Sequence, residues 1–74
     1  MFDELKEILV KELEVPADDI TPSAEFINDL KLNSLEIADL VVFCEDKFEV
    51  EIDEEDLHSI ITVQDLCDYM AEKV

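Results

Sequence analysis

The sequence predicts an all-α fold, a small four-helix bundle with three longer helices, one short third helix and a long loop between helices 1 and 2. In three segments, apolar residues recur every three or four positions, which is the spacing of one buried helix face. The one alternating segment, residues 50–52, has no second strand with which to pair. Hydrophobic residues make up 49% of the 74 residues, enough for a single core, so we expect residues 1–74 to form one domain.

The first helix is predicted over about residues 3–14. Charged residues face away from an apolar stripe that comprises Phe2, Leu5, Ile8, Leu9 and Leu13. Pro16 ends the helix, because the residue before a proline is disfavoured in the helical conformation.

Residues 16–33 are predicted to form a long connection that begins with turn-forming and capping residues. A short helical turn is expected near residues 23–28. The connection also contains apolar residues that predict anchoring to the core: Ile20, Phe26, Ile27, Leu30 and Leu32. A loop this long in a small domain is typical of a functional segment.

The second helix is predicted over residues 34–48, where Asn33 and Glu36 have the spacing of a capping box. Its apolar stripe is predicted to comprise Ile37, Ala38, Val41, Cys44 and Phe48, widened by Leu40 and Val42. The opposite, solvent-facing side is acidic, with Glu36, Asp39 and Asp46 and the nearby Glu45 and Glu49.

A short third helix is predicted from a cap at Asp53 to about residue 58 or 59. Thr62 and Asp65 indicate the start of a last helix over about residues 63–73. Its apolar stripe is predicted to comprise Val63, Leu66, Cys67, Met70 and Val74. The long loop after the first helix favours one crossover connection over simple up-and-down topology.

The charge of the chain limits its partners. With 22 Asp and Glu against 5 Lys and Arg, the formal charge is −17, yet the apolar content is too high for a disordered acidic tail. Direct nucleic-acid binding is excluded, because phosphate contacts need clusters of basic residues. An anionic membrane surface is disfavoured for the same reason. Basic protein surfaces are the expected partners.

Other classes are excluded by residues that are absent. The sequence has no glycine, which rules out glycine-rich phosphate loops and dinucleotide fingerprints. No apolar run approaches membrane-spanning length and no secretory signal pattern is present, so we expect no membrane insertion and a cytoplasmic location. Cys44 and Cys67 are expected to be reduced core residues. Nothing in the sequence indicates an oligomer, and we expect a monomer.

Ser34 is the most informative residue. It stands at the predicted start of a helix, where unpaired backbone N–H groups and the positive end of the helix dipole favour a phosphate. Ser34 is therefore a candidate for a covalently attached phosphate-containing group. A catalytic pair with His58, the sole histidine, would lack a third member and a glycine-built oxyanion loop. We therefore predict no catalytic residues. The acids at 53–56 do not have the register of an EF-hand, so we also predict no dedicated metal site.

In order and spacing, the chain resembles acyl carrier proteins of the bacterial type II fatty acid synthase. The matching features are the first helix, the loop with Phe26, the pair Asp29-Leu30, Asn33-Ser34-Leu35 at the second helix, the run 45–52, and residues 60–65 before the last helix. The resemblance implies a single acyl-carrier domain that catalyses nothing. It also implies that a phosphopantetheinyl transferase moves 4′-phosphopantetheine from coenzyme A to Ser34, forming a phosphodiester flanked by Asn33 and Leu35. The thiol of this arm would hold acyl chains as thioesters for the enzymes of fatty acid synthesis.

Two residues depart from the family pattern beside this serine. The family usually has Asp-Ser-Leu, but here position 33 is Asn, which keeps the capping role and removes a negative charge. Lys31 replaces a small residue, often glycine, and adds a positive charge close to where the phosphate would be. Both changes are expected to affect the efficiency of modification.

An acyl cargo needs shelter from water, since burial is worth roughly 0.8 kcal/mol per methylene. The candidate lining residues are Phe26, Leu40, Cys44, Ile52, Leu57, Ile60, Leu66 and Tyr69.

The transferase and the synthesis enzymes are expected to bind through basic patches, in encounters driven by charge. The acids expected to contact these patches are Glu36, Asp39, Glu45, Asp46 and Asp56.

Two alternatives remain open from the sequence. One is a carrier for a polyketide, peptide or other specialised acyl pathway. The other, from a different class, is an acidic interaction protein such as a nucleic-acid mimic, which would leave Ser34 unmodified and bind one basic protein tightly.

Overall fold

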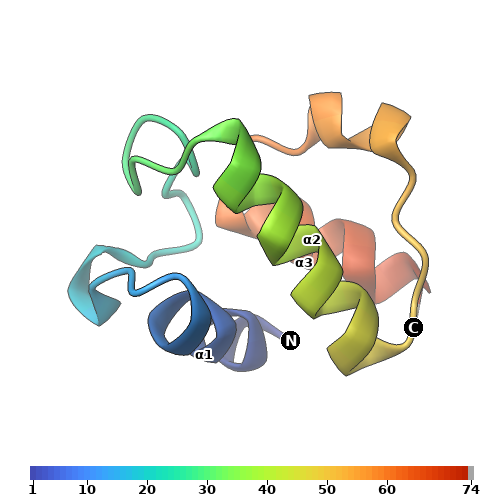
Figure 1. Cartoon of the computed structure of the whole chain (residues 1–74), viewed down its shortest axis with the longest axis horizontal. Helices are drawn as coiled ribbons and strands as arrows, with labels where there is room; N and C mark the ends of the chain where they lie inside the picture. The colour runs from blue at the N-terminus through green and yellow to red at the C-terminus, as the bar shows by residue number, and fades with distance from the viewer. Residues whose placement is uncertain (74) are drawn as a thin grey trace.

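The computed structural model describes residues 1–73, and Val74, which we assigned to the last apolar stripe, lies outside them. The element order is α1 (Phe2–Glu12), η1 (Ala17–Asp19), α2 (Ser34–Phe48), η2 (Glu54–Ser59) and α3 (Val63–Lys73), where η marks a 3-10 helix. In Figure 1, α2 crosses in front of α3, and the long loop between α1 and α2 lies at one end of the molecule. The predicted small all-helical bundle is confirmed, with the short third helix formed as η2.

The core is shared by the three α-helices. Its largest fully buried side chains include Leu5 and Leu9 from α1, Leu40 from α2, and Leu66 and Met70 from α3. The helix α1 contacts both α2 and α3. Burial of these stripes is the main force that holds such short helices in place, because isolated helices of this length are marginal in water.

The end of α1 differs from the prediction. The helix ends at Glu12 and not at residue 14, because the chain reverses before Pro16. Glu14 has a left-handed conformation with φ 57°, and the Val15 N–H then donates to the Leu9 carbonyl over 3.0 Å. This reversal buries Val15 against the core.

Because the chain has no glycine, residues with a Cβ occupy the left-handed positions of its turns. Three charged residues, Glu14, Lys31 and Glu49, have positive φ values of 57°, 61° and 54°. Left-handed backbone costs a residue with a Cβ roughly 1–2 kcal/mol. The surrounding packing therefore has to hold each of these turns in place.

The loop between α1 and α2 is anchored to the core as predicted, with one exception. Ile20, Phe26, Leu30 and Leu32 are all buried. Ile27 is 62% exposed, so its assignment to the core is wrong. The reason is the local turn at residues 26–29, which directs Phe26 and Leu30 inward while Ile27 faces outward. The Asp29 N–H donates to the Glu25 carbonyl over 2.9 Å, so this is a single helical turn, slightly later than the one expected near residues 23–28.

A connection that the sequence did not indicate joins this loop to the start of α3. Glu25 and Thr62 form an isolated antiparallel β-bridge. The Phe26 N–H donates to the Ile61 carbonyl over 3.1 Å, and the Val63 N–H donates to the Ala24 carbonyl over 2.9 Å. These bonds fix the loop against the segment between η2 and α3.

The apolar stripe of α2 is narrower than predicted. Leu40 and Cys44 are buried, and Ile37, Val41 and Phe48 are half-buried. Val42 is 54% exposed and Ala38 is also exposed, so neither belongs to the core face. None of the helices in residues 1–73 is long and apolar enough to be a candidate for crossing a membrane.

Candidate functional site

Ser34 is the first residue of α2, and its side chain is exposed. The segment that leads to it is fixed on both sides of Lys31 by the buried side chains of Leu30 and Leu32. The Leu32 N–H also donates to the Phe26 carbonyl over 2.9 Å. A well-anchored loop therefore presents an accessible hydroxyl at a helix start.

The start of α2 has the predicted capping box. The Asn33 side-chain oxygen accepts from the Glu36 N–H at 2.9 Å, and the Asn33 N–H donates to the Glu36 carboxylate at 3.1 Å. Among the hydrogen bonds of residues 1–73, none uses the backbone N–H of Ser34 or Leu35. These two donors, together with the positive end of the helix dipole, favour an anion beside the Ser34 hydroxyl.

The five acids predicted to bind partners have different surroundings. Asp39 and Asp46 are exposed, and within the described chain no hydrogen bond or ion pair involves their side chains. The Glu36 carboxylate belongs to the capping box. Glu45 accepts from the Ile52 N–H at 2.9 Å, and Asp56 accepts from the Tyr69 hydroxyl at 2.6 Å. Three of the five carboxylates thus also stabilise the fold.

Two exposed apolar residues accompany the acids on α2. Leu35 is 78% exposed and Val42 is 54% exposed. Leu35, Asp39, Val42 and Asp46 follow one another at spacings of four, three and four, so they lie along one face of the helix. We call this set the α2 outer face. Val42 was predicted to widen the core stripe, and exposure of Leu35 was not predicted, although the separation of Leu35 from that stripe was a usable signal.

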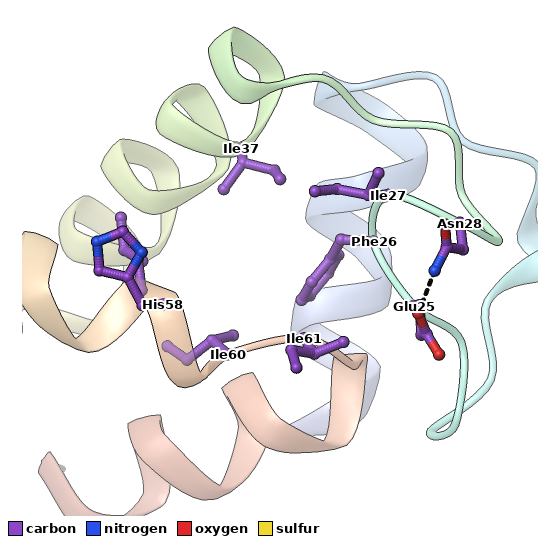
Figure 2. Close-up of a pocket in the computed structure, with 9 residues that line it drawn as sticks. Glu25, Phe26, Ile27, Asn28, Ile37, His58, Ile60 and Ile61 are labelled. Atoms are coloured by element: carbon purple, nitrogen blue, oxygen red, sulfur yellow. Dashed lines mark hydrogen bonds between the residues drawn. The ribbon is translucent and has the colours of Figure 1, made fainter.

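A cleft of about 340 Å³ opens between the loop before α2, the first turns of α2 and the segment after η2. Figure 2 shows Ile37 on one side of it and Ile60 and Ile61 on the opposite side, with Phe26 between them at the loop end and His58 at the η2 end. The lining residues are Glu25, Phe26, Ile27, Asn28, Ile37, Leu57, His58, Ile60 and Ile61. Ile37 lies about one helical turn after Ser34, so one wall of the cleft belongs to the helical turn that begins at the serine.

The cleft agrees only in part with the eight lining residues proposed from the sequence. Phe26, Leu57 and Ile60 line it. Leu40, Cys44, Ile52 and Leu66 are buried in the core beneath, and Tyr69 is half-buried behind η2. The sequence analysis did not identify Ile37, Ile61 or His58 as lining residues, because their positions depend on the β-bridge and on the path of η2.

The two walls of the cleft are held differently. The loop wall is tied to the segment before α3 by the backbone bonds at Phe26 and Val63. The η2 wall has no buried residue and is held to α3 by the bond from Tyr69 to Asp56. Because the apolar contacts of η2 with the core are only half-buried, we expect this wall to open locally at a lower free-energy cost than the loop wall.

Cys44 and Cys67 are both free and buried, as predicted. Burial, with smaller contributions from the neighbouring Cys67 and Glu45, raises the pKa of the Cys44 thiol to about 12. Burial also raises the pKa of the Cys67 thiol. Because the fold favours the neutral thiol, the stability contribution of Cys44 is present below its ordinary pKa and is lost as the pH rises through about 9 toward 12.

This burial predicts that Cys44 resists alkylation in the folded protein. At about pH 8, a pKa that is about three units higher lowers the thiolate fraction about a thousandfold. We expect iodoacetamide to leave Cys44 unlabelled in the native protein and to label it readily in concentrated urea, as read by peptide mass spectrometry. Labelling of native Cys44 at the unfolded rate would contradict the buried placement.

No group of three His, Cys, Asp or Glu side chains in residues 1–73 is arranged to hold a metal ion.

Comparison with known proteins adds independent information. Residues 3–70 match the family described as "Phosphopantetheine attachment site". An acyl carrier protein of Syntrophus aciditrophicus (strain SB) is 50% identical over 64 residues, which cover 86% of this chain and 80% of that protein. An acyl carrier protein of Clostridium perfringens (strain SM101 / Type A) is 43% identical over 72 residues, 97% of this chain and 95% of that protein.

Proposed function

The chain belongs to the acyl carrier protein family, whose cofactor is phosphopantetheine, and from that premise we propose that Ser34 is the residue that bears the cofactor. Members of this family are carriers and not catalysts. The observation that supports Ser34 is its exposed hydroxyl at the start of α2, beside two backbone N–H groups without acceptors.

The residues around Ser34 fit a phosphodiester. The cap at Asn33 is a neutral amide, so no carboxylate stands immediately before the serine. The Glu36 carboxylate is directed back to the Asn33 N–H, which keeps it engaged in the capping box. When bound, the cofactor supplies a flexible arm and a terminal thiol that forms thioesters. The protein supplies the attachment point, a favourable helix terminus and an adjacent apolar cleft.

We propose that the cargo is a fatty acyl chain and that the cleft shelters its first part. Phe26, Ile37 and Ile60 offer an apolar lining next to the attachment residue. Each methylene removed from water there stabilises the loaded form by roughly 0.8 kcal/mol. A longer chain would need η2 to move away, and would then reach the core residues Leu40, Cys44, Ile52 and Leu66 beneath.

We further propose that a phosphopantetheinyl transferase and the enzymes of fatty acid synthesis bind the α2 outer face through basic patches. Asp39 and Asp46 supply charge, which speeds encounter, while Leu35 and Val42 supply apolar contact area. Contacts of this kind suit a carrier that must dissociate from each enzyme. The formal charge of −17 favours a monomer through self-repulsion, and a cytoplasmic location is part of the proposal.

The intact mass tests the attachment. After incubation with coenzyme A, magnesium and a broad-specificity phosphopantetheinyl transferase, we expect the parent protein to gain one phosphopantetheine. Ser34→Ala is expected to gain none. Ser23→Ala, which removes another exposed hydroxyl from the same loop, is the matched control and should be modified like the parent.

Two results would overturn this assignment. One is modification of Ser34→Ala, which would place the cofactor elsewhere. The other is a parent protein that stays unmodified with several transferases, even after Asn33→Asp restores the family's usual residue at that position.

A further inference from the structure

The segment around Ser34 differs in charge from the rest of the chain. Residues 30–35 contain one lysine and no acid, so they have a formal charge of +1 within a chain of −17. Asp29 and Glu36 flank this segment, but both are engaged locally: Asp29 accepts from the Glu25 N–H at 2.7 Å and Glu36 accepts from the Asn33 N–H. Neither flanking carboxylate is therefore paired with the positive charge of Lys31, which lies close to the candidate attachment site.

The backbone of Lys31 is held in place on both sides. It has a left-handed conformation with φ 61° between the buried residues Leu30 and Leu32. The Leu30 N–H donates to the Glu25 carbonyl at 3.0 Å, and the Leu32 N–H donates to the Phe26 carbonyl at 2.9 Å. Since both neighbours point into the core, the Lys31 side chain is left exposed at a fixed point of the loop.

Lys31 has no ion pair in the part of the chain that the structure describes. Lys11 pairs with Glu7 at 2.9 Å, and Lys73 lies over the Tyr69 ring at 5.1 Å. Other lysines also have no ion pair in residues 1–73, so Lys31 is distinguished by its position close to Ser34 and not by the missing partner. Its charge is not neutralised by the fold.

We propose that Lys31 is a positioning residue that pairs with the phosphodiester on Ser34. This inference rests on the proposed function of Ser34. Ser34 is three positions after Lys31, so their Cα atoms lie at most about 11 Å apart, a gap that a lysine side chain and a phosphate group can bridge. The ammonium and the free N–H groups of Ser34 and Leu35 then face the same anion.

The pairing would act at two stages. During modification, the transferred phosphorus forms a bond to the Ser34 oxygen, and its bond to the bridging oxygen of the coenzyme A pyrophosphate breaks. Adenosine 3′,5′-bisphosphate leaves with that oxygen, and the serine proton goes to a base of the transferase. A nearby ammonium favours the anionic phosphate throughout this transfer. After the transfer, the same ion pair limits the motion of the part of the phosphopantetheine arm that lies next to the phosphate.

The test compares Lys31→Gln, Lys31→Arg and Lys47→Gln, the last of which removes a lysine from the far end of α2. We expect Lys31→Gln to lower kcat/KM of the transferase about twofold to fivefold, as for one exposed ion pair. We also expect it to shift the phosphorus-31 resonance of the modified protein. Lys31→Arg should restore both values, and Lys47→Gln should leave the resonance unchanged. High salt should reduce the difference in kcat/KM between the parent protein and Lys31→Gln.

The outcomes separate the two proposals. If all variants are modified and share one phosphorus resonance, Lys31 does not pair with the phosphate, while the function of Ser34 stands. If Lys31→Arg behaves like Lys31→Gln, a structural role of the lysine replaces the electrostatic one. If neither the parent nor any variant is modified, both proposals are wrong.

Discussion

Phe26→Ala is expected to lower the free energy of unfolding by about 3–5 kcal/mol. The side chain is 3% exposed and fills the space between the loop and the helices, so alanine would leave a cavity. Domains are stable by only roughly 0.05–0.15 kcal/mol per residue, so this loss approaches the total for a chain of this size. Urea denaturation followed by circular dichroism measures it.

The neighbouring Ile27→Ala is the matched control. Ile27 belongs to the same turn but is 62% exposed, so its truncation is expected to change the free energy of unfolding by no more than about 0.5 kcal/mol. If Phe26→Ala cost as little as Ile27→Ala, the loop would not be anchored as described. Added salt should partly restore the stability of Phe26→Ala, because it screens carboxylate repulsion.

Phe26 and Ile27 show what the sequence could and could not predict. Helical periodicity identified the buried faces of α1 and α3, because a regular helix places every third or fourth residue on one side. In the loop there is no period, so two adjacent apolar residues looked equivalent. The turn at residues 26–29, closed by the Asp29 N–H donating to the Glu25 carbonyl at 2.9 Å, decides which of them is buried.

Side-chain bonds to the backbone were predictable where both partners are close in sequence. The boxes Asn33–Glu36 and Thr62–Asp65 both form, and in the second the Thr62 and Ile61 N–H groups lower the pKa of the Asp65 carboxyl. The bonds from Ile52 to Glu45 and from Tyr69 to Asp56 span longer separations. No local pattern encodes those, so Glu45 and Asp56 looked like simple surface acids.

In the candidate site, too, one part follows from local sequence signals and the other depends on contacts between distant segments. Ser34 could be proposed from the sequence because helix starts have local signals and because the chain resembles a family with a serine there. The cleft could not, since the lining residues Phe26 and Ile61 come together through the β-bridge between Glu25 and Thr62. A single bridge between segments so far apart leaves no pattern in one sequence.

Charge reversal on the α2 outer face is the second large expected effect. Asp39→Lys combined with Asp46→Lys should lower kcat/KM of the phosphopantetheinyl transferase by about tenfold to a hundredfold at low salt, mainly through KM. Both carboxylates are exposed and form no ion pair within residues 1–73, so the double variant should fold with unchanged stability. Steady-state kinetics with unmodified protein as substrate measures the effect.

The control makes the same change of net charge elsewhere. Asp18 and Asp19 are exposed in η1, outside the α2 outer face, and their replacement by lysine tests the global field alone. If the transferase docks on α2, the η1 variant should lose much less activity at low salt. The gap between the two variants should then narrow as salt shortens the screening length from about 10 Å at 0.1 M to about 3 Å at 1 M. Equal losses in the two variants would mean that only net charge attracts the enzyme and that the α2 outer face is not its docking surface.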